Sequence, residues 1–342
     1  MSLEESLLKR RLLRWKLTLI YLTMFLILTL ISSIVIGPVY IPLDQVLQVF
    51  YRAAIGAPQL HEEFAGIVLQ IRLPRILMGI MVGAILSVAG AVMQGLFRNP
   101  LAGPYVLGVS SGAALGAALS TTFLPFTMGI YTSPLSAFLG ALASLTLVYL
   151  IVRLSGGFRA ETLLLAGISV SYLFSAILSL VIWISRKDAH LILVWILGGL
   201  TRSDWMRVEL MAPIGIIGLL ISYAYSRDLN AILLGEEVAR SLGVNVRLVE
   251  VVLPLVASLI TSVAVSFTGA IGFVGLMMPH LMRRIVGADH RILLPASALA
   301  GGVFLTWADC LARLLLELPV GVITALSGVP FFLYLLRRSR RA

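Results

Sequence analysis

Few side chains in this sequence have the type and spacing that catalysis or metal binding requires. His280 is a lone histidine inside an apolar run, and no second ligand stands near it at the spacing of a helical metal site. Cys310 is the only cysteine, so the chain can form no intrachain disulfide, C-x-x-C pair or cysteine-based metal site. We expect His280 to form a hydrogen bond between packed helices and Cys310 to be a small helix residue. No metal site and no cofactor of this chain are predicted.

The motifs of common catalytic classes are missing as well. The sequence has no G-x-x-x-x-G-K-[ST] phosphate loop, so ATP hydrolysis is not expected in this chain. It has no H-E-x-x-H zinc motif and no recognisable nucleophile with its base, which argues against an intramembrane enzyme. Glu161 and Glu250 lie near the ends of apolar runs, where water can reach them, and neither is assigned to proton transfer. We predict no catalytic residue.

The elements that hold these residues are predicted to be helices in a membrane. Of the 342 residues, 59% are hydrophobic and 12% are charged, whereas soluble domains carry about 25% charged residues. This composition excludes a soluble fold. The net charge of +10 could indicate nucleic-acid binding, but the basic residues form short clusters between apolar runs rather than one aromatic-rich patch. We interpret them as determinants of membrane orientation and expect no nucleic-acid partner.

Apolar runs of membrane-spanning length recur along the whole chain, and each could cross a hydrocarbon layer of about 30 Å as a helix. The predicted spans are 17–36, 76–96, 104–121, 134–152, 163–184, 208–225, 248–267, 271–286, 292–310 and 319–336. Gly79 and Gly83, and then Gly108, Gly112 and Gly116, recur at four-residue spacing, which favours close helix packing. The sequence therefore predicts an all-α integral membrane protein in which residues 1–342 form one ten-helix transmembrane domain.

The number of spans depends on residues 191–200, a short apolar stretch that ends in two glycines. With ten spans, most Lys and Arg residues lie on the inner side, as the positive-inside rule requires. Counting this stretch as an eleventh span would instead place most of them on the outer side. We therefore predict a short outer-face helix here and both termini in the cytoplasm. The basic residues before Leu17 could belong to a secretory signal, but no A-x-A-like cleavage site follows, so 17–36 is interpreted as the first span.

The longest predicted cytoplasmic loop is residues 227–247, between the sixth and seventh spans. Its sequence places Glu236 and Glu237 early and Arg240 later, the order that suits the dipole of a short helix. Gly243 stands where such a helix would stop. The residues alone leave open whether this segment is a passive solvated turn or a contact site for a partner.

Four stretches go beyond generic membrane sequence, and together they resemble the FecCD/BtuC-like family of ABC importer permeases for iron-siderophores, haem and vitamin B12. They are 72–75 (RLPR) with 94–102 (QGLFRNPLA) and 107–112 (LGVSSG), 235–244 (GEEVARSLGV), 272–276 (GFVGL) with the Pro-His pair that follows, and 317–321 (ELPVG). The agreement runs from about residue 17 to 336 in order and spacing. The resemblance implies the ten-helix fold of a type II ABC importer permease in the cell membrane.

The resemblance also implies partners. Permeases of this family are homodimers that work with two cytoplasmic ATP-binding-cassette ATPase subunits and an external substrate-binding protein. ATP and Mg are then used by the ATPase subunits and not by this chain. The expected function is translocation of a metal chelate, such as an iron-siderophore, haem or cobalamin, which the external protein delivers.

The residues that match the family's functional positions fall into three groups. Similarity assigns contact with the ATPase to Gly235, Glu236, Ala239, Leu242 and Gly243 in the segment 227–247. It assigns docking of the binding protein to Arg72, Arg75 and Arg313, with lipid-headgroup contact or, for Arg313, an i,i+4 pair with Asp309 as the alternatives. It places Leu101 and Ala160 at the cytoplasmic gate.

A gradient-driven secondary transporter is the alternative function that the sequence leaves open. Such a carrier needs ion-coupling acids or polar groups at mid-membrane, and these are scarce here. Co-purification with an ATPase, and loss of transport when that ATPase is inactivated, would separate the two functions.

Overall fold

The computed structural model describes residues 3–58, 62–124, 129–155, 157, 159–185 and 187–339, and over these residues the chain is helical with no strand. The first elements are α1 (Leu3–Val35), α2 (Leu43–Ala54), α3 (Glu62–Gly66), a π-helical turn (Ile67–Arg72), α4 (Leu73–Leu96), α5 (Val109–Phe123), a 3₁₀ turn (Gly129–Tyr131), α6 (Thr132–Leu154) and α7 (Ala160–Ile184). Then follow α8 (Ala189–Ile196), α9 (Trp205–Ala224), α10 (Ser226–Leu233), α11 (Glu236–Ser241), α12 (Val246–Thr268), α13 (Val274–Val286), α14 (His290–Leu314) and α15 (Val320–Ser339).

Seven helices of the described chain are long and apolar enough to cross a membrane. They are Lys9–Val35, Glu62–Leu96, Gly129–Leu154, Ala160–Ile184, Trp205–Ala224, Val246–Thr268 and His290–Leu314. The other three predicted spans correspond to α5, α13 and α15. With 15 residues in α5 and 13 in α13, these two helices rise only about 20 Å. The predictions of an integral membrane protein and of an all-helical fold are confirmed, and the count of ten spans stays a prediction.

The apolar stretch 191–200 does not form a span of its own. It contributes to α8, which has eight residues and is therefore about 12 Å long. A helix of this length cannot cross a hydrocarbon layer of about 30 Å. The prediction of a short helix at this place is confirmed, whereas the sidedness inferred from it stays a prediction.

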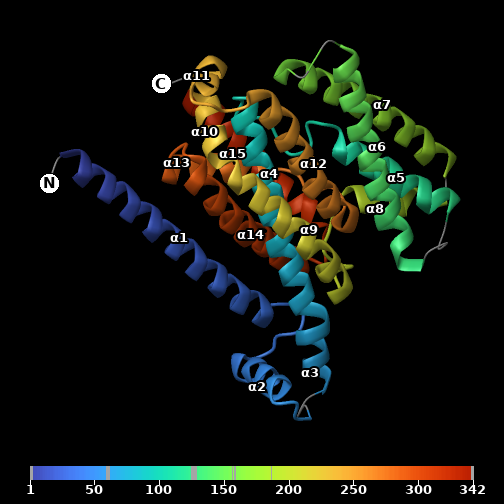
Figure 1. The fold of residues 1–342 in the computed structure, drawn as a ribbon. Coiled ribbons are helices and arrows are strands. Elements are labelled where there is room, and N and C mark those ends of the chain that lie inside the picture. The colour runs from blue at the N-terminus through green and yellow to red at the C-terminus, as the bar shows by residue number, and fades with distance from the viewer. Residues whose placement is uncertain are drawn as a thin grey trace.

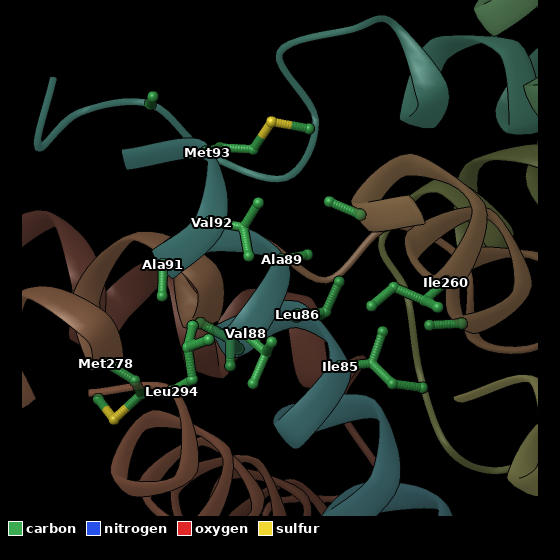
Figure 2. Close-up of a cluster of buried hydrophobic side chains, with 14 of the residues drawn as sticks. Ile85, Leu86, Val88, Ala89, Ala91, Val92, Met93, Ile260, Met278 and Leu294 are labelled. Carbon is green, nitrogen blue, oxygen red and sulfur yellow. The ribbon is translucent and has the colours of Figure 1, made fainter. Parts of the chain in front are cut away.

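A central block, which we define as α4, α13 and α14, forms the core of the molecule. Most residues of α4 are buried, and its apolar side chains meet Met278 of α13 and Leu294 of α14 (Figure 2). A Cβ atom on Gly83 would lie 2.2 Å from the carbonyl oxygen of Gly301, and one on Gly90 would lie 1.7 Å from that of Gly275. Because no side chain fits at these contacts, the three helices approach as close as their backbones allow.

A lateral group, α5, α6 and α7, lies beside the central block, and its three helices pack on one another (Figure 1). Here too the contacts are made by glycine. A Cβ on Gly112 would lie 2.4 Å from the carbonyl oxygen of Gly140, and one on Gly116 would lie 2.0 Å from that of Ser136. The close packing predicted from the four-residue spacing of these glycines is confirmed. Helix α12 contacts both α4 and the lateral group, so it joins the two parts.

Candidate functional site

The predicted ATPase-contact segment folds as two short helices, α10 and α11, between the spanning helices α9 and α12. Gly235 and Gly243 stand at the two ends of α11 with φ of 120° and 84°. Nothing lies within 4 Å of the Cβ position at either glycine, so the left-handed backbone and not lack of space requires glycine there. The positive φ angles of these two glycines separate α11 from α10 before it and from α12 after it.

The surface of α11 has a distinct apolar side. Ala239 is fully buried, whereas Leu242 is 64% exposed. Val238, 43% exposed, lies one helical turn before Leu242 and continues the exposed row. Leu234, 67% exposed, lies at the end of α10, separated from α11 by the non-helical Gly235. The ion pair of Glu236 with Arg240, 3.4 Å apart, borders this row. The family resemblance did not single out Leu234 and Val238, although for Val238 the four-residue spacing to Leu242 was a signal that could have found it.

An acidic residue at the start of α14 lies beside α10. The Asp289 carboxylate is 2.6 Å from the Arg291 guanidinium and 3.3 Å from that of Arg11, and it accepts a hydrogen bond from Asn230 at 2.8 Å. The hydrogen bond from Arg291 is the main cause that lowers the pKa of Asp289 to about 2, and it outweighs burial, which acts the other way. The side chain is therefore a carboxylate at neutral pH, and it also caps α14 by accepting from the backbone N–H of Arg291.

The three arginines predicted to dock a binding protein are buried. Arg72, Arg75 and Arg313 are only 4%, 6% and 5% exposed. The guanidinium of Arg72 donates to the backbone carbonyl oxygens of Ile34, Val35 and Val39, in the last turn of α1 and the loop after it. Such hydrogen bonds satisfy the group internally and leave little of it for a partner.

Arg75 and Arg313 share one counter-ion. Asp309 of α14 lies 2.9 Å from Arg75 and 3.2 Å from Arg313, and its side chain is 2% exposed. Arg313 also donates to the Ser33 hydroxyl of α1. The i,i+4 pair of Arg313 with Asp309, weighed as the alternative to docking, is confirmed. The docking role of the three arginines stays a prediction, and their burial favours a structural role.

The two predicted gate residues lie in different settings. Leu101 is 61% exposed in the loop after α4, where the Asn99 side chain accepts from its backbone N–H at 2.9 Å. It lines a cavity of about 490 Å³ whose far wall is α7, through residues such as Ile168 and Tyr172. Ala160 begins α7 and is half-buried, and it is not among the residues that line this cavity. The gate role stays a prediction, with a physical basis for Leu101 only.

The His280 side chain lies against an aromatic residue of α15. Its ring meets that of Phe331 edge-on, with centroids 6.1 Å apart. Its Nε2 is buried and has no hydrogen-bond partner in the described part of the chain. The predicted hydrogen bond between helices is therefore wrong for this nitrogen, and the contact shown with α15 is the one between the two rings. No group of three or more His, Cys, Asp or Glu that could hold a metal occurs among the described residues.

The whole arrangement has known counterparts. The model of the FecCD transport family matches residues 25–338 of the sequence. The chain belongs to this family. The cobalamin import system permease protein BtuC of Halobacterium salinarum is 47% identical over 85% of this FecCD chain and 78% of the relative. The hemin transport system permease protein HmuU of Yersinia pestis is 43% identical over 80% of this chain and 82% of the relative.

A solved structure extends the comparison to the fold. An inward-facing metal-chelate type ABC transporter superposes with a TM-score of 0.80 at 34% identity, over 94% of this FecCD chain and 99% of the other. Because the match covers nearly the whole of both chains, this chain has the helix arrangement of that ABC transporter. The family resemblance inferred from the sequence motifs is confirmed. This FecCD chain is a multi-pass membrane permease subunit of an ABC transporter.

Proposed function

We propose that two copies of this chain form the translocation pathway of an ABC importer, which two ATPase subunits drive from the cytoplasmic side. The observation that carries the proposal is the surface of α10 and α11. Leu234, Val238 and Leu242 present apolar side chains to water between two spanning helices. Exposed apolar rows with a charged border mark protein contact sites. An ATPase groove that takes up α11 would bury this row, with Gly235 and Gly243 allowing the turn.

The cargo in this proposal is a metal chelate delivered by an external binding protein. Support comes from the relatives, whose names state cobalamin and hemin as cargo, and from the cavity beside Leu101. This cavity is lined mainly by apolar side chains of α7 and of the loop after α4. A pathway on the two-fold axis of a homodimer would be bounded by one such wall from each copy. A largely apolar wall can let several bulky chelates pass, so the binding protein would select among them.

Reconstitution tests the proposal. The chain is purified in detergent with its ATPase and then placed in liposomes together with the binding protein. We expect the ATPase to co-purify, and we expect uptake of one of cyanocobalamin, haemin and ferric citrate to require ATP. An ATPase that cannot hydrolyse ATP should abolish uptake. Uptake that follows a proton or sodium gradient without an ATPase would instead establish the secondary transporter.

A further inference from the structure

The side chain of Asn230 in α10 is joined to the start of α14. Its Oδ1 accepts the backbone N–H of His290 at 2.8 Å and lies 2.9 Å from the Nδ1 of the same residue. Its Nδ2 donates to the Asp289 carboxylate at 2.8 Å. Because an amide oxygen can only accept, the Nδ1 of His290 carries a proton. Both ends of one amide therefore bind two consecutive residues of another element.

These bonds satisfy groups that α14 cannot satisfy by itself. The first backbone N–H groups of a helix have no partner within it. Asp289 accepts from the N–H of Arg291, and Asn230 accepts from that of His290. The first turn of α14 is thus capped both by its own N-cap residue and by α10. We call the segment 227–247, which contains most of α10 and all of α11, the coupling segment. We call Asn230, Asp289 and His290 the clamp.

The clamp reaches the central block directly. His290 is fully buried, and a Cβ on Gly95, in the last turn of α4, would lie 2.5 Å from its Nε2. Helix α10 packs on both α4 and α14 and lies away from α5, α6 and α7 (Figure 1). His290 is buried and its hydrogen bonds with Asn230 are partly buried. Hydrogen bonds shielded from water are costly to leave unmade, so the joint resists opening.

The second helix of the segment is held differently. Helix α11 is joined to its neighbours through Gly235 and Gly243. Its Glu236 to Arg240 ion pair and the hydrogen bond of its Ser241 hydroxyl lie within the helix itself. Only Ala239 of α11 is buried. The segment therefore consists of an exposed contact helix and a clamped helix.

We propose that Asn230 is a positioning residue that ties the coupling segment to the central block, so that a displacement of α11 by the ATPase moves α4, α13 and α14 together. This inference rests on the proposed function. The close glycine contacts between α4, α13 and α14 make the block move as one body, because packed interiors transmit strain and do not deform continuously. Among the described residues, α10 contacts α4 and α14 more than it contacts the lateral group, which meets the central block through α12. The wall of the cavity formed by α7 should therefore move less than the central block.

Hydrogen exchange measured by mass spectrometry tests the clamp without knowledge of the cargo. The chain is studied in nanodiscs with its ATPase, with and without ATP and vanadate. In the unsubstituted complex, nucleotide should change exchange both in 226–244 and in 287–294. In Asn230→Ala the response of 226–244 should remain, and the response of 287–294 should fall by half or more. A purely structural role would raise exchange at 287–294 equally in both nucleotide states and keep their difference.

Two further variants complete the experiment. Asp204→Ala removes a comparable helix cap, the acceptor for the backbone N–H of Arg207 at the start of α9, and should leave both responses intact. The exchanged pair Asn230→Asp with Asp289→Asn keeps one amide donor and one carboxylate acceptor in the joint, and it should restore the response of 287–294. A full response in Asn230→Ala, or failure of the exchanged pair to restore it, would overturn the clamp. Absence of the ATPase from the unsubstituted complex would overturn the proposed function and the clamp with it.

Discussion

The arginine cluster (Arg72, Arg75 and Arg313 with Asp309) and the coupling segment lie at opposite ends of α4 and α14, and both were predicted from sequence as docking sites for partner proteins. The arginines are at most 6% exposed and are held by backbone carbonyl oxygens and one buried carboxylate. In the coupling segment, Leu242 is 64% exposed. No atom lies within 4 Å of the Cβ position at Gly235 or Gly243, the glycines at the two ends of α11. Charge in a loop position therefore does not by itself show whether a surface is free to meet a partner. The contact role of the coupling segment and the docking role of the arginines both stay predictions, and only the coupling segment has an exposed surface for a partner.

The difference is also one of energy. A buried ion pair gives little net stability, but removal of one partner leaves an uncompensated charge and costs several kcal/mol. An exposed apolar side chain gives the monomer almost nothing and contributes when a partner covers it. Substitutions in the arginine cluster should therefore lower the stability of the fold. Substitutions in the coupling segment should lower the affinity for a partner and leave the stability unchanged.

The largest effect is expected for Asp309→Ala. This change leaves the guanidiniums of Arg75 and Arg313 buried without their shared counter-ion, which should destabilise the protein by about 3–5 kcal/mol. Thermal unfolding of the purified protein measures it. Glu317→Ala is the matched control, because Glu317 lies 3.9 Å from Arg75 but is 59% exposed, and its loss should cost at most about 1 kcal/mol. Unchanged stability of Asp309→Ala with weakened binding-protein affinity would establish docking as the role of the cluster.

The next effect concerns binding and not folding. Leu242→Asp places a charge in the exposed apolar row, where an ATPase groove would have to desolvate it, so affinity for the ATPase should fall at least about tenfold, or about 1.4 kcal/mol. Pull-down of the ATPase from detergent measures the change. Membrane insertion and thermal stability should not change, since Leu242 is exposed in the free chain. Normal recovery of the ATPase with Leu242→Asp would remove α11 from the contact.

How much of the fold and of the candidate site could be predicted from sequence depends on how far apart in the chain two contacting residues lie. The apolar runs predicted the helices, and the glycine spacing predicted contacts such as those of Gly83 and Gly112, because both signals lie within one element. The pair of Arg313 with Asp309 is one helical turn apart and could be foreseen. Arg75 meets the same carboxylate across 234 residues, and Asn230 meets His290 across 60. No pattern within a helix encodes such meetings, which arise only when the helices pack.

A smaller effect is expected at the gate. Leu101→Ala should raise the ATP-independent leak through liposomes several-fold, because the exposed side chain lines the cavity between the loop after α4 and α7. ATPase binding should remain normal, since Leu101 is outside α10 and α11. Ala160→Gly, at the other predicted gate position, serves as the comparison and should leave the leak unchanged because Ala160 does not line the cavity. Equal leak rates for the parent and Leu101→Ala would place the constriction elsewhere.

The smallest expected effect is a pH dependence at the end of α14 next to the coupling segment. The pKa of Asp289 is about 2 in the folded chain, mainly because of the hydrogen bond from Arg291, and about 3.9 for a free aspartate. A folded-state pKa below the unfolded value means that the carboxylate stabilises the fold above pH of about 4 and that this contribution is lost as pH falls towards 2. Arg11 and Arg291 are 55% and 48% exposed, so solvent screening limits the contribution to at most about 1 kcal/mol.

Asp289→Asn keeps the helix cap without a titrating group. The parent should therefore be the more stable at pH 5, and the difference in thermal unfolding should shrink by pH 3. A difference that is the same at both pH values would show that the charge of Asp289 does not hold α14 to its neighbours, and the clamp would then rest on the Asn230 to His290 bonds alone.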